Sequence, residues 1–250
     1  MLNHPTLEQL RHLGLDGMAQ GFRALAGDPE AERLSHAEWL GLLLDHELTA
    51  RSQKRLDTRL RAAGLRHTAT IEDVDYRAPR GLDRALFRTL ASCQWIRQRH
   101  NLLVTGPCGV GKSWLACALG HQACREDLAV TYYRVPRLFA ALDLARHDGR
   151  YGRLLKAIAR VKLLILDDWG PEPLAADQQR DLLEIVEDRY DAGSILMTSQ
   201  LPVDKWYEII GSPTLADAIL DRIVHNAHRL TLHGESLRKR TTPTSQMETA

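Results

Sequence analysis

Gly106-Pro107-Cys108-Gly109-Val110-Gly111-Lys112-Ser113 matches the pattern G-x-x-x-x-G-K-[ST] at every position. The apolar residues 102–105 before it predict a buried strand, and the small and apolar residues 114–120 after it predict a helix. Glycines let successive backbone N–H groups point at phosphate oxygens, and a helix N-terminus adds a partial positive charge. The stretch therefore predicts a P-loop that binds ATP or GTP.

The motif also assigns roles within that site. Lys112 is expected to reach the β- and γ-phosphates, and the Ser113 hydroxyl is expected to bind Mg²⁺. The expected phosphate cradle consists of Gly106, Pro107, Cys108, Gly109, Val110, Gly111, Lys112, Ser113 and Trp114. A chance glycine-rich turn is the alternative, and the flanking strand and helix argue against it.

Residues 163–168, Leu-Leu-Ile-Leu-Asp-Asp, predict a central parallel strand whose acidic end meets the ligand crevice. Asp167 is the expected second Mg²⁺ partner, through water, because Mg²⁺ keeps much of its hydration shell. Asp168 is the expected carboxylate that orients the attacking water. It is one methylene shorter than glutamate, which suggests a slow intrinsic turnover that a partner accelerates.

Composition excludes several classes of protein. The 250 residues are 44% hydrophobic, which suffices for one α/β core and a smaller helical unit. The apolar runs are too short to span a bilayer, and no signal pattern opens the chain. Cys93, Cys108, Cys117 and Cys124 form neither a C-x-x-C pair nor a zinc pattern. A reducing cytoplasm and no membrane partner are expected.

The net charge is +1, but two segments are basic. Residues 51–100 carry 12 Lys and Arg against 5 Asp and Glu, and residues 134–162 carry 8 against 2. Two such blocks favour a phosphate backbone as partner, read without sequence preference. Solvated helix faces paired with acids are the alternative. The candidate DNA contacts are Arg51, Lys54, Arg55, Arg59, Arg134, Arg137, Arg146, Arg150, Arg153 and Lys156; Arg61, Arg66 and Arg160 belong to the same blocks.

The order of elements predicts a doubly wound α/β fold behind a helical N-terminus. Residues 1–70 are expected to form a helical domain, with a capping box at Ser35 and Glu38. Residues 71–240 are expected to form the nucleotide-binding domain, beginning with a helix over 82–98. Its parallel strands are expected at 102–105, 129–134, 163–168, 194–199 and 229–232. Residues 241–250 read as a disordered tail.

The chain resembles the AAA+ superfamily of P-loop ATPases, and within it the IstB group of transposition helpers, relatives of the DnaC-type helicase loaders. The resemblance extends over the whole chain except the tail. Besides the P-loop, it is carried by residues 76–83 (YRAPRGLD), 164–170 (LILDDWG), 198–203 (TSQLPV), 213–229 (PTLADAILDRIVHNAHR) and 234–236 (GES). It implies a five-stranded parallel sheet between helices. The helical lid domain of many such ATPases is expected to be absent, because only a short tail follows the fifth expected strand.

The resemblance also implies two further site residues. Gln200 resembles the polar sensor of the γ-phosphate or the attacking water. Arg222 resembles the arginine finger that reaches the ATP of a neighbouring subunit, which implies a homo-oligomer. An ion pair with Asp217 or Asp221 on its own helix is the alternative for Arg222. Arg238 is a weaker candidate for a second sensor.

The implied function is an ATPase that assembles on double-stranded DNA and recruits or regulates the DDE transposase encoded beside it. A replicative helicase loader is the second hypothesis, with a preference for single strands. A P-loop kinase or other small-molecule phosphotransferase is the third. No acceptor-binding segment is visible in the sequence for that last class.

Overall fold

The structure, a computed structural model, describes residues 5–237. The chain divides into two compact units, one up to Arg59 and the other from Leu60 onward. The expected domain limits at 70/71 and 240/241 stay predictions. The expected tail, residues 241–250, and the candidate sensor Arg238 lie outside the described residues.

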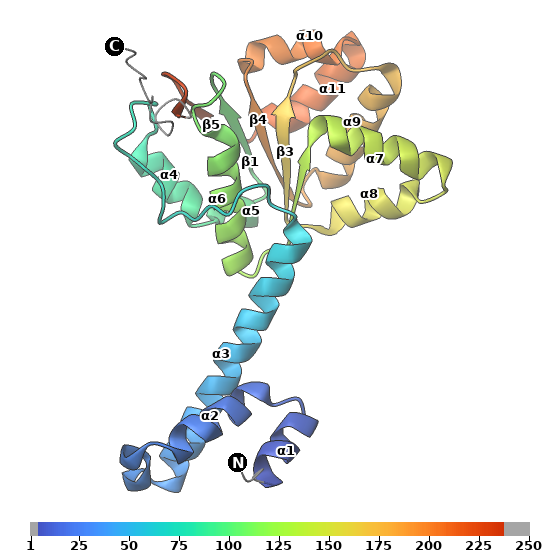
Figure 1. The fold of residues 1–250 in the computed structure, drawn as a ribbon. Helices are drawn as coiled ribbons and strands as arrows, with labels where there is room; N and C mark the ends of the chain where they lie inside the picture. Colours follow the sequence, from blue (N-terminus) through green and yellow to red (C-terminus); the bar gives the residue numbers. More distant parts are fainter. Residues whose placement is uncertain (1–4, 238–250) are drawn as a thin grey trace, which may run out of the picture. The chain divides into compact units, whose positions relative to one another are not determined.

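The first unit is helical, as expected (Figure 1). It contains α1 (Pro5–His12), α2 (Asp16–Ala26), the short 3-10 helix η1 (Pro29–Arg33) and most of α3 (His36–Ala63). The capping box that begins α3 is formed: Glu38 N donates to Ser35 Oγ at 3.3 Å, and Ser35 N donates to Glu38 Oε2 at 2.8 Å. The Phe22 and Trp39 rings pack edge-to-face and join α2 to α3.

The second unit contains a parallel sheet of five strands in the order β2-β3-β4-β1-β5. The strands are β1 (Asn101–Thr105), β2 (Val130–Arg134), β3 (Leu163–Trp169), β4 (Ser194–Ser199) and β5 (Ala227–Thr231). All five expected strands are present, with bounds that differ by at most two residues. The predicted five-stranded parallel sheet is confirmed.

Helices connect the strands: α4 (Arg84–Ala91), α5 (Gln94–Arg97), α6 (Lys112–Arg125), α7 (Val135–His147), α8 (Tyr151–Arg160), α9 (Ala176–Arg189), η2 (Val203–Lys205), α10 (Trp206–Ile210) and α11 (Pro213–Val224). The single helix expected over 82–98 is wrong, because Cys93 adopts a left-handed backbone with φ of +58° and separates α4 from α5. Within the described residues, no α-helix follows β5.

Apolar residues cover both faces of the sheet. On one face Leu103, Leu164 and Met197 pack with residues of α7, α8, α9 and α11 in one buried cluster. On the other face α6 lies so close that a Cβ on Gly120 would approach Ile165 Cδ1 to 2.8 Å. Figure 1 shows α7, α8 and α9 together on one side of the sheet, with α4 and α6 on the other.

A buried arginine closes the end of the sheet where β3 and β4 begin. Arg189 is 1% exposed, and its guanidinium donates to the carbonyl oxygens of Ile158 (2.7 Å), Val161 (3.1 Å), Lys162 (3.4 Å) and Ser194 (2.7 Å). Burial lowers the pKa of Arg189 to about 10. Its partners are neutral carbonyl groups. Because they belong to the segment before β3 and to the start of β4, Arg189 joins both to α9.

Candidate nucleotide site

The P-loop lies between the carboxyl end of β1 and the start of α6, where parallel-sheet proteins bind ligands. Gly106, Gly109 and Gly111 have φ values of +145°, +85° and +95°. Other residues rarely adopt this backbone, and it turns the loop around a cavity of about 560 Å³. That volume suits a small-molecule ligand. The cavity is lined by Arg66, His67, Asp73, Asp75, Arg80, Cys108, Gly109, Gly111, Lys112, Ser113, Trp114, Arg134, Asp168, Gln200 and Leu237.

Lys112 is held at the centre of the loop. It is 8% exposed, and Nζ donates to the carbonyl oxygens of Gly106 and Pro107, both at 2.7 Å. Gly106 and Pro107 therefore position the ammonium, and Val110 is buried beneath the loop. A buried ammonium at the N-terminus of α6, within a glycine-rich loop, is suited to a polyphosphate.

Asp167 is fully buried at the end of β3 and accepts hydrogen bonds from three hydroxyl groups. Ser113 Oγ donates to Oδ1 at 2.7 Å, Thr198 Oγ1 donates to the same oxygen, and Tyr132 OH donates to Oδ2 at 2.5 Å. Burial, reinforced by the carboxylate, raises the pKa of Tyr132. Ser113 and Asp167 thus present two oxygens side by side, the hard ligands that Mg²⁺ prefers.

Asp168 stands on an irregularity of β3, because the register with β4 shifts between Leu166 and Trp169. Its φ is +60°, a backbone that Asp and Asn tolerate better than glutamate. The bulge turns Asp168 into the cavity, where Arg134 holds it. Arg134 Nε and Nη2 lie 2.9 and 2.7 Å from Asp168 Oδ2. The two predicted acids therefore lie together, and Arg134 lies with them.

Gln200 follows the carboxyl end of β4 and lines the same cavity as Lys112 and Asp168. An adjoining hollow of about 460 Å³ is also lined by these three residues and by Arg134. The polar residues predicted after β1, β3 and β4 thus converge at the carboxyl ends of the strands. Their convergence follows from the parallel strands, whose carboxyl ends meet there.

Arg222 lies at the opposite end of the sheet, where the amino ends of the strands are found. Asn101, the first residue of β1, donates from Nδ2 to the Arg222 carbonyl oxygen at 3.1 Å. The five residues of β1 separate that end from the P-loop by about 17 Å at the usual rise per residue. The guanidinium donates to Ala218 O at 2.8 Å and lies 3.3 Å from Glu187. Its ion pair is with Glu187 of α9, and the described contacts include none with Asp217 or Asp221.

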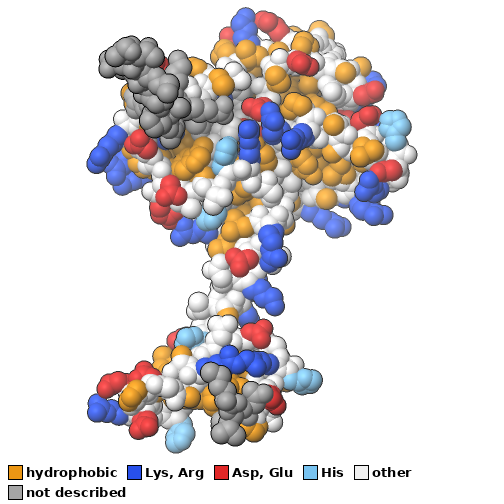
Figure 2. Space-filling model, in the orientation of Figure 1, with side chains coloured by type: hydrophobic (Ala, Val, Ile, Leu, Met, Phe, Trp, Pro, Cys, Tyr) orange, Lys and Arg blue, Asp and Glu red, His pale blue; other side chains and the backbone are white. Residues whose placement is uncertain are grey.

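The first basic block is split between the units. Arg51, Lys54, Arg55 and Arg59 follow one face of α3 and line a groove of about 570 Å³ with Thr58. Figure 2 shows Lys and Arg side chains along the part of α3 that this view presents. Arg66 lies in the nucleotide cavity instead, with Nη1 3.8 Å from Asp167 Oδ2.

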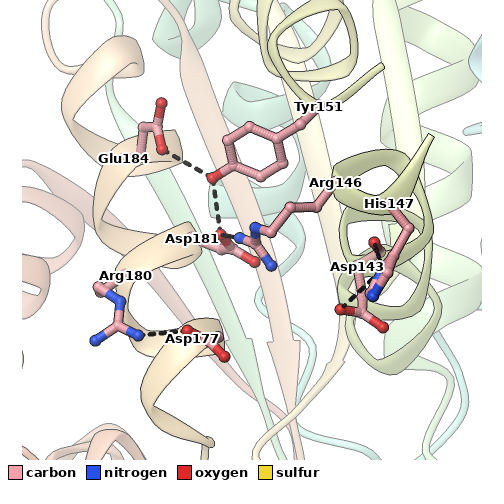
Figure 3. Close-up of polar contacts among 8 residues, drawn as sticks. All are labelled: Asp143, Arg146, His147, Tyr151, Asp177, Arg180, Asp181 and Glu184. Carbon is pink, nitrogen blue, oxygen red and sulfur yellow. Dashed lines mark hydrogen bonds and ion pairs between the residues drawn. The ribbon is translucent and has the colours of Figure 1, made fainter. Parts of the chain in front are cut away.

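The second basic block contains a structural cluster. Arg146 Nη2 donates to Asp181 Oδ1 at 2.5 Å, and the guanidinium stacks 4.7 Å from the centre of the Tyr151 ring. Tyr151 OH lies 2.7 Å from Asp181 Oδ1 and 2.8 Å from Glu184 Oε2 of α9, so these two carboxylates share its one proton (Figure 3). Burial and these carboxylates raise the pKa of Tyr151. Arg146 therefore joins α7 and α8 to α9.

The remaining members of the second block differ in their surroundings. Arg150 pairs with Asp148 two residues before it, with Nε 2.8 Å from Oδ2. Arg137 on α7 and Arg153 and Lys156 on α8 are exposed. These three candidate contacts are therefore open to a large ligand, as is the exposed Arg160 of the same block.

Several residues of the cavity were not predicted from the sequence. They are Arg66, His67, Asp73, Asp75, Arg80, Arg134 and Leu237, and Thr198 and Tyr132 join them at Asp167. Arg80 belongs to the motif at 76–83, which carries the family resemblance without indicating a contact. The location of Arg80 in the cavity is seen only in the three-dimensional structure.

The model of the family "IstB-like ATP binding protein" matches residues 8–245. The chain belongs to this family. Its IstB-like sequence is 62% identical over 239 residues to an insertion sequence ATP-binding protein of Sinorhizobium fredii, covering 96% of this chain and 98% of the relative. It is 50% identical over 203 residues to the ATP-binding protein of insertion sequence IS1162 from Pseudomonas fluorescens, covering 81% and 88%.

Solved structures confirm the AAA+ fold of this IstB-like chain. The crystal structure of DnaI matches with a TM-score of 0.57 at 22% identity, covering 66% of this chain and 91% of that one. AMPPCP-bound DnaA from Aquifex aeolicus matches with a TM-score of 0.56 at 18% identity, covering 70% and 53%. The predicted family and fold are both confirmed. No helix within residues 5–237 has the length and apolarity needed to cross a bilayer.

Proposed function

We propose that the chain binds ATP with Mg²⁺ in the cavity of the P-loop and hydrolyses it as an oligomer assembled on double-stranded DNA. In this proposal the assembly serves the DDE transposase of its own insertion sequence. The observation that carries the ATPase part is the convergence of Lys112, Ser113, Asp167 and Asp168 around one cavity. The 62% identity to an insertion sequence ATP-binding protein supports the transposition part.

Each side chain has a distinct task. Lys112 binds the β- and γ-phosphates in exchange for the carbonyl oxygens of the loop. Ser113 and Asp167 hold Mg²⁺, which when bound neutralises charge on the phosphates. Asp168 accepts a proton from the attacking water or orients it, and Gln200 holds that water or the γ-phosphate. The remaining cradle residues, including Cys108 and Trp114, enclose the nucleotide.

Two features of the structure oppose hydrolysis by an isolated chain: the pairing of Arg134 with Asp168, and the distance of Arg222 from its own P-loop. Arg134 occupies the Asp168 oxygen that would receive the water. The main chain of Arg222 lies beside the first residue of β1, about one strand length (roughly 17 Å) from its own P-loop, and in this proposal the residue supports the site of a neighbouring subunit. A guanidinium fork stabilises charge on the transferring phosphoryl group. Both features favour hydrolysis only after assembly. We also propose a cytoplasmic location, because the DNA partner lies there.

The DNA surface in this proposal consists of exposed basic side chains. Arg51, Lys54, Arg55 and Arg59 form one set on α3, and Arg137, Arg153 and Lys156 form another on α7 and α8. Arg150 is a weaker member because Asp148 neutralises it. Contacts of this kind bind phosphates without reading bases.

The experiment is ATP-dependent binding to duplex and single-stranded DNA of equal length, with assembly size measured by light scattering in the same sample. We expect large assemblies on duplex DNA with ATP, dispersed by salt. A preference for single strands would favour a helicase loader. Binding and turnover that ignore DNA would contradict both functions and leave an ordinary P-loop enzyme.

A further inference from the structure

The residues after β5 cross the P-loop. Residues 232–237, the strap, run from the end of β5 to the wall of the nucleotide cavity, which Leu237 lines. Three backbone N–H groups of the strap donate to carbonyl oxygens around the loop: Leu232 to Thr105 (2.8 Å), His233 to Arg80 (2.9 Å) and Leu237 to Gly109 (3.0 Å). The strap is thus attached both just before the P-loop and within it.

Glycines allow this approach from both sides. A Cβ on Gly106 would lie 2.3 Å from Leu232 O, and one on Gly109 would lie 2.1 Å from Ser236 Oγ. On the strap, Gly234 has φ of +92°, and a Cβ there would lie 2.4 Å from Pro79 O. No Cβ fits at such distances. Gly106 and Gly109 are therefore required by the strap as well as by a phosphate.

Arg80 links the same parts through its side chain. It is 3% exposed, Nη1 donates to Val110 O at 3.4 Å, and Nη2 donates to Asp75 O at 3.0 Å. Burial lowers the pKa of this guanidinium. Its main-chain oxygen accepts the His233 bond of the strap. One residue therefore connects a P-loop carbonyl, the segment at 73–81 and the strap.

A phosphate loop binds weakly when it must be ordered on binding, because the conformational entropy of the loop is then lost at that step. Here the strap and Arg80 hold Gly109 and Val110 in the loop through hydrogen bonds to their carbonyl oxygens. The loop is ordered when the chain folds. Nucleotide affinity should therefore depend on these hydrogen bonds within the protein as well as on direct contacts with the nucleotide.

We propose that the strap is a positioning element of the nucleotide site, and that Arg80 is the positioning residue that joins it to the P-loop. This rests on the proposed ATP site and adds a determinant of its affinity that lies beyond the last strand. A purely structural role would lower stability and leave the affinity of the folded protein unchanged.

The test is Gly234→Ala in the full chain, because the added Cβ meets Pro79 O and forces the strap to move. Gly149→Ala is the matched control: its φ of +73° imposes a similar backbone strain, no atom lies within 4 Å of the added Cβ, and it lies in the turn between α7 and α8. Affinity for a fluorescent ADP analogue with Mg²⁺ is titrated well below the unfolding temperature of each variant. We expect Gly234→Ala to bind at least tenfold more weakly than Gly149→Ala.

A second variant, Arg80→Lys, keeps the charge and loses the planar fork that reaches two carbonyl oxygens. It should also weaken binding of the ADP analogue by about tenfold while the protein stays folded. If neither variant folds, hydrogen exchange of the unmutated chain decides: ADP should slow exchange of the Leu237 amide, which donates to Gly109, and unchanged exchange would overturn the proposal.

Lys112→Ala in the same titration separates the two levels of inference. Unchanged binding by Lys112→Ala would overturn the nucleotide site itself. Loss of binding in Lys112→Ala together with control-like binding in Gly234→Ala and Arg80→Lys would overturn the strap alone.

Discussion

Arg134 and Asp168 are paired across the carboxyl ends of β2 and β3, with both Nε and Nη2 of the arginine within 2.9 Å of one carboxylate oxygen. The pair lies in the nucleotide cavity, beside Lys112 and Gln200. Asp168 is the expected water-orienting acid, and Arg134 was expected to bind DNA. Arg134 stays a candidate DNA contact, and a DNA phosphate that attracted it would release Asp168 and so couple DNA binding to hydrolysis.

Changing either member should separate binding from turnover. Asp168→Asn should keep nucleotide affinity within about threefold and lower hydrolysis by about 10²-fold or more, since it removes a general base. Arg134→Gln should raise DNA-independent hydrolysis and flatten its response to duplex DNA. Steady-state turnover with and without DNA measures both. Equal DNA stimulation in Arg134→Gln and the unmutated chain would contradict the coupling.

Arg222→Ala should bind nucleotide normally and lose hydrolysis by about 10³-fold, the lower range for an arginine finger. Mixing it with Lys112→Ala should restore activity at roughly a quarter of the sites, because random neighbours pair an intact P-loop with an intact arginine at that frequency. Glu187→Gln, which removes only the partner at 3.3 Å, is the control and should stay active. A mixture without activity would place the finger elsewhere.

Arg146 near the end of α7 and Arg153 near the start of α8 lie on either side of the turn at 148–150 but should behave differently. Arg153→Ala and Lys156→Ala should weaken duplex binding and each reduce the salt slope by about one. Arg146→Ala should leave the slope unchanged and lower the melting temperature, since it leaves the buried Asp181 with fewer donors. A reduced slope in Arg146→Ala would return this residue to the DNA surface.

Arg189→Met should destabilise the second unit by about 3 kcal/mol or more, because four carbonyl oxygens each lose a hydrogen bond from the guanidinium. Guanidinium unfolding measures this loss. Arg180→Met, which removes an exposed pair with Asp177 on the same helix (Figure 3), should leave the midpoint nearly unchanged. Equal midpoints for the two variants would contradict the assigned role of Arg189.

The cysteines supply a test of the cavity that needs no mutation. Cys108 is exposed in the P-loop, whereas Cys93, Cys117 and Cys124 are buried, and burial raises the pKa of Cys93 to about 11. A thiol reagent at pH 8 should label one cysteine per native chain, and ATP with Mg²⁺ should slow that reaction at least tenfold. Undiminished labelling at saturating ATP would mean that the nucleotide does not cover Cys108.

The local signals of the sequence predicted the fold well, because glycines, apolar runs and caps report on their own neighbourhoods. The P-loop, the five strands and the capping box at Ser35 all lie where expected. The break at Cys93 was missed because no glycine or proline marks it. There the left-handed backbone is adopted by a residue whose type does not predict it.

The strand order explains what the sequence could not supply for the site. Pairing of β2 with β3 places Arg134 opposite Asp167. The sequence of neither strand indicates that the two residues are neighbours. Likewise, Asp181 lies 35 residues from Arg146, and the strap reaches Gly109 from more than a hundred residues away. Charge alone therefore grouped arginines that the fold assigns to different tasks.

The left-handed backbone at Asp168 has an evolutionary consequence. Asparagine tolerates that conformation as well as aspartate does, and one transition in either aspartate codon produces it. A single-base change can therefore remove the carboxylate while the fold is kept. Under the proposed function, such a chain would join assemblies with unmutated copies and block them, so an inactivated insertion sequence could restrain the active elements in the same genome.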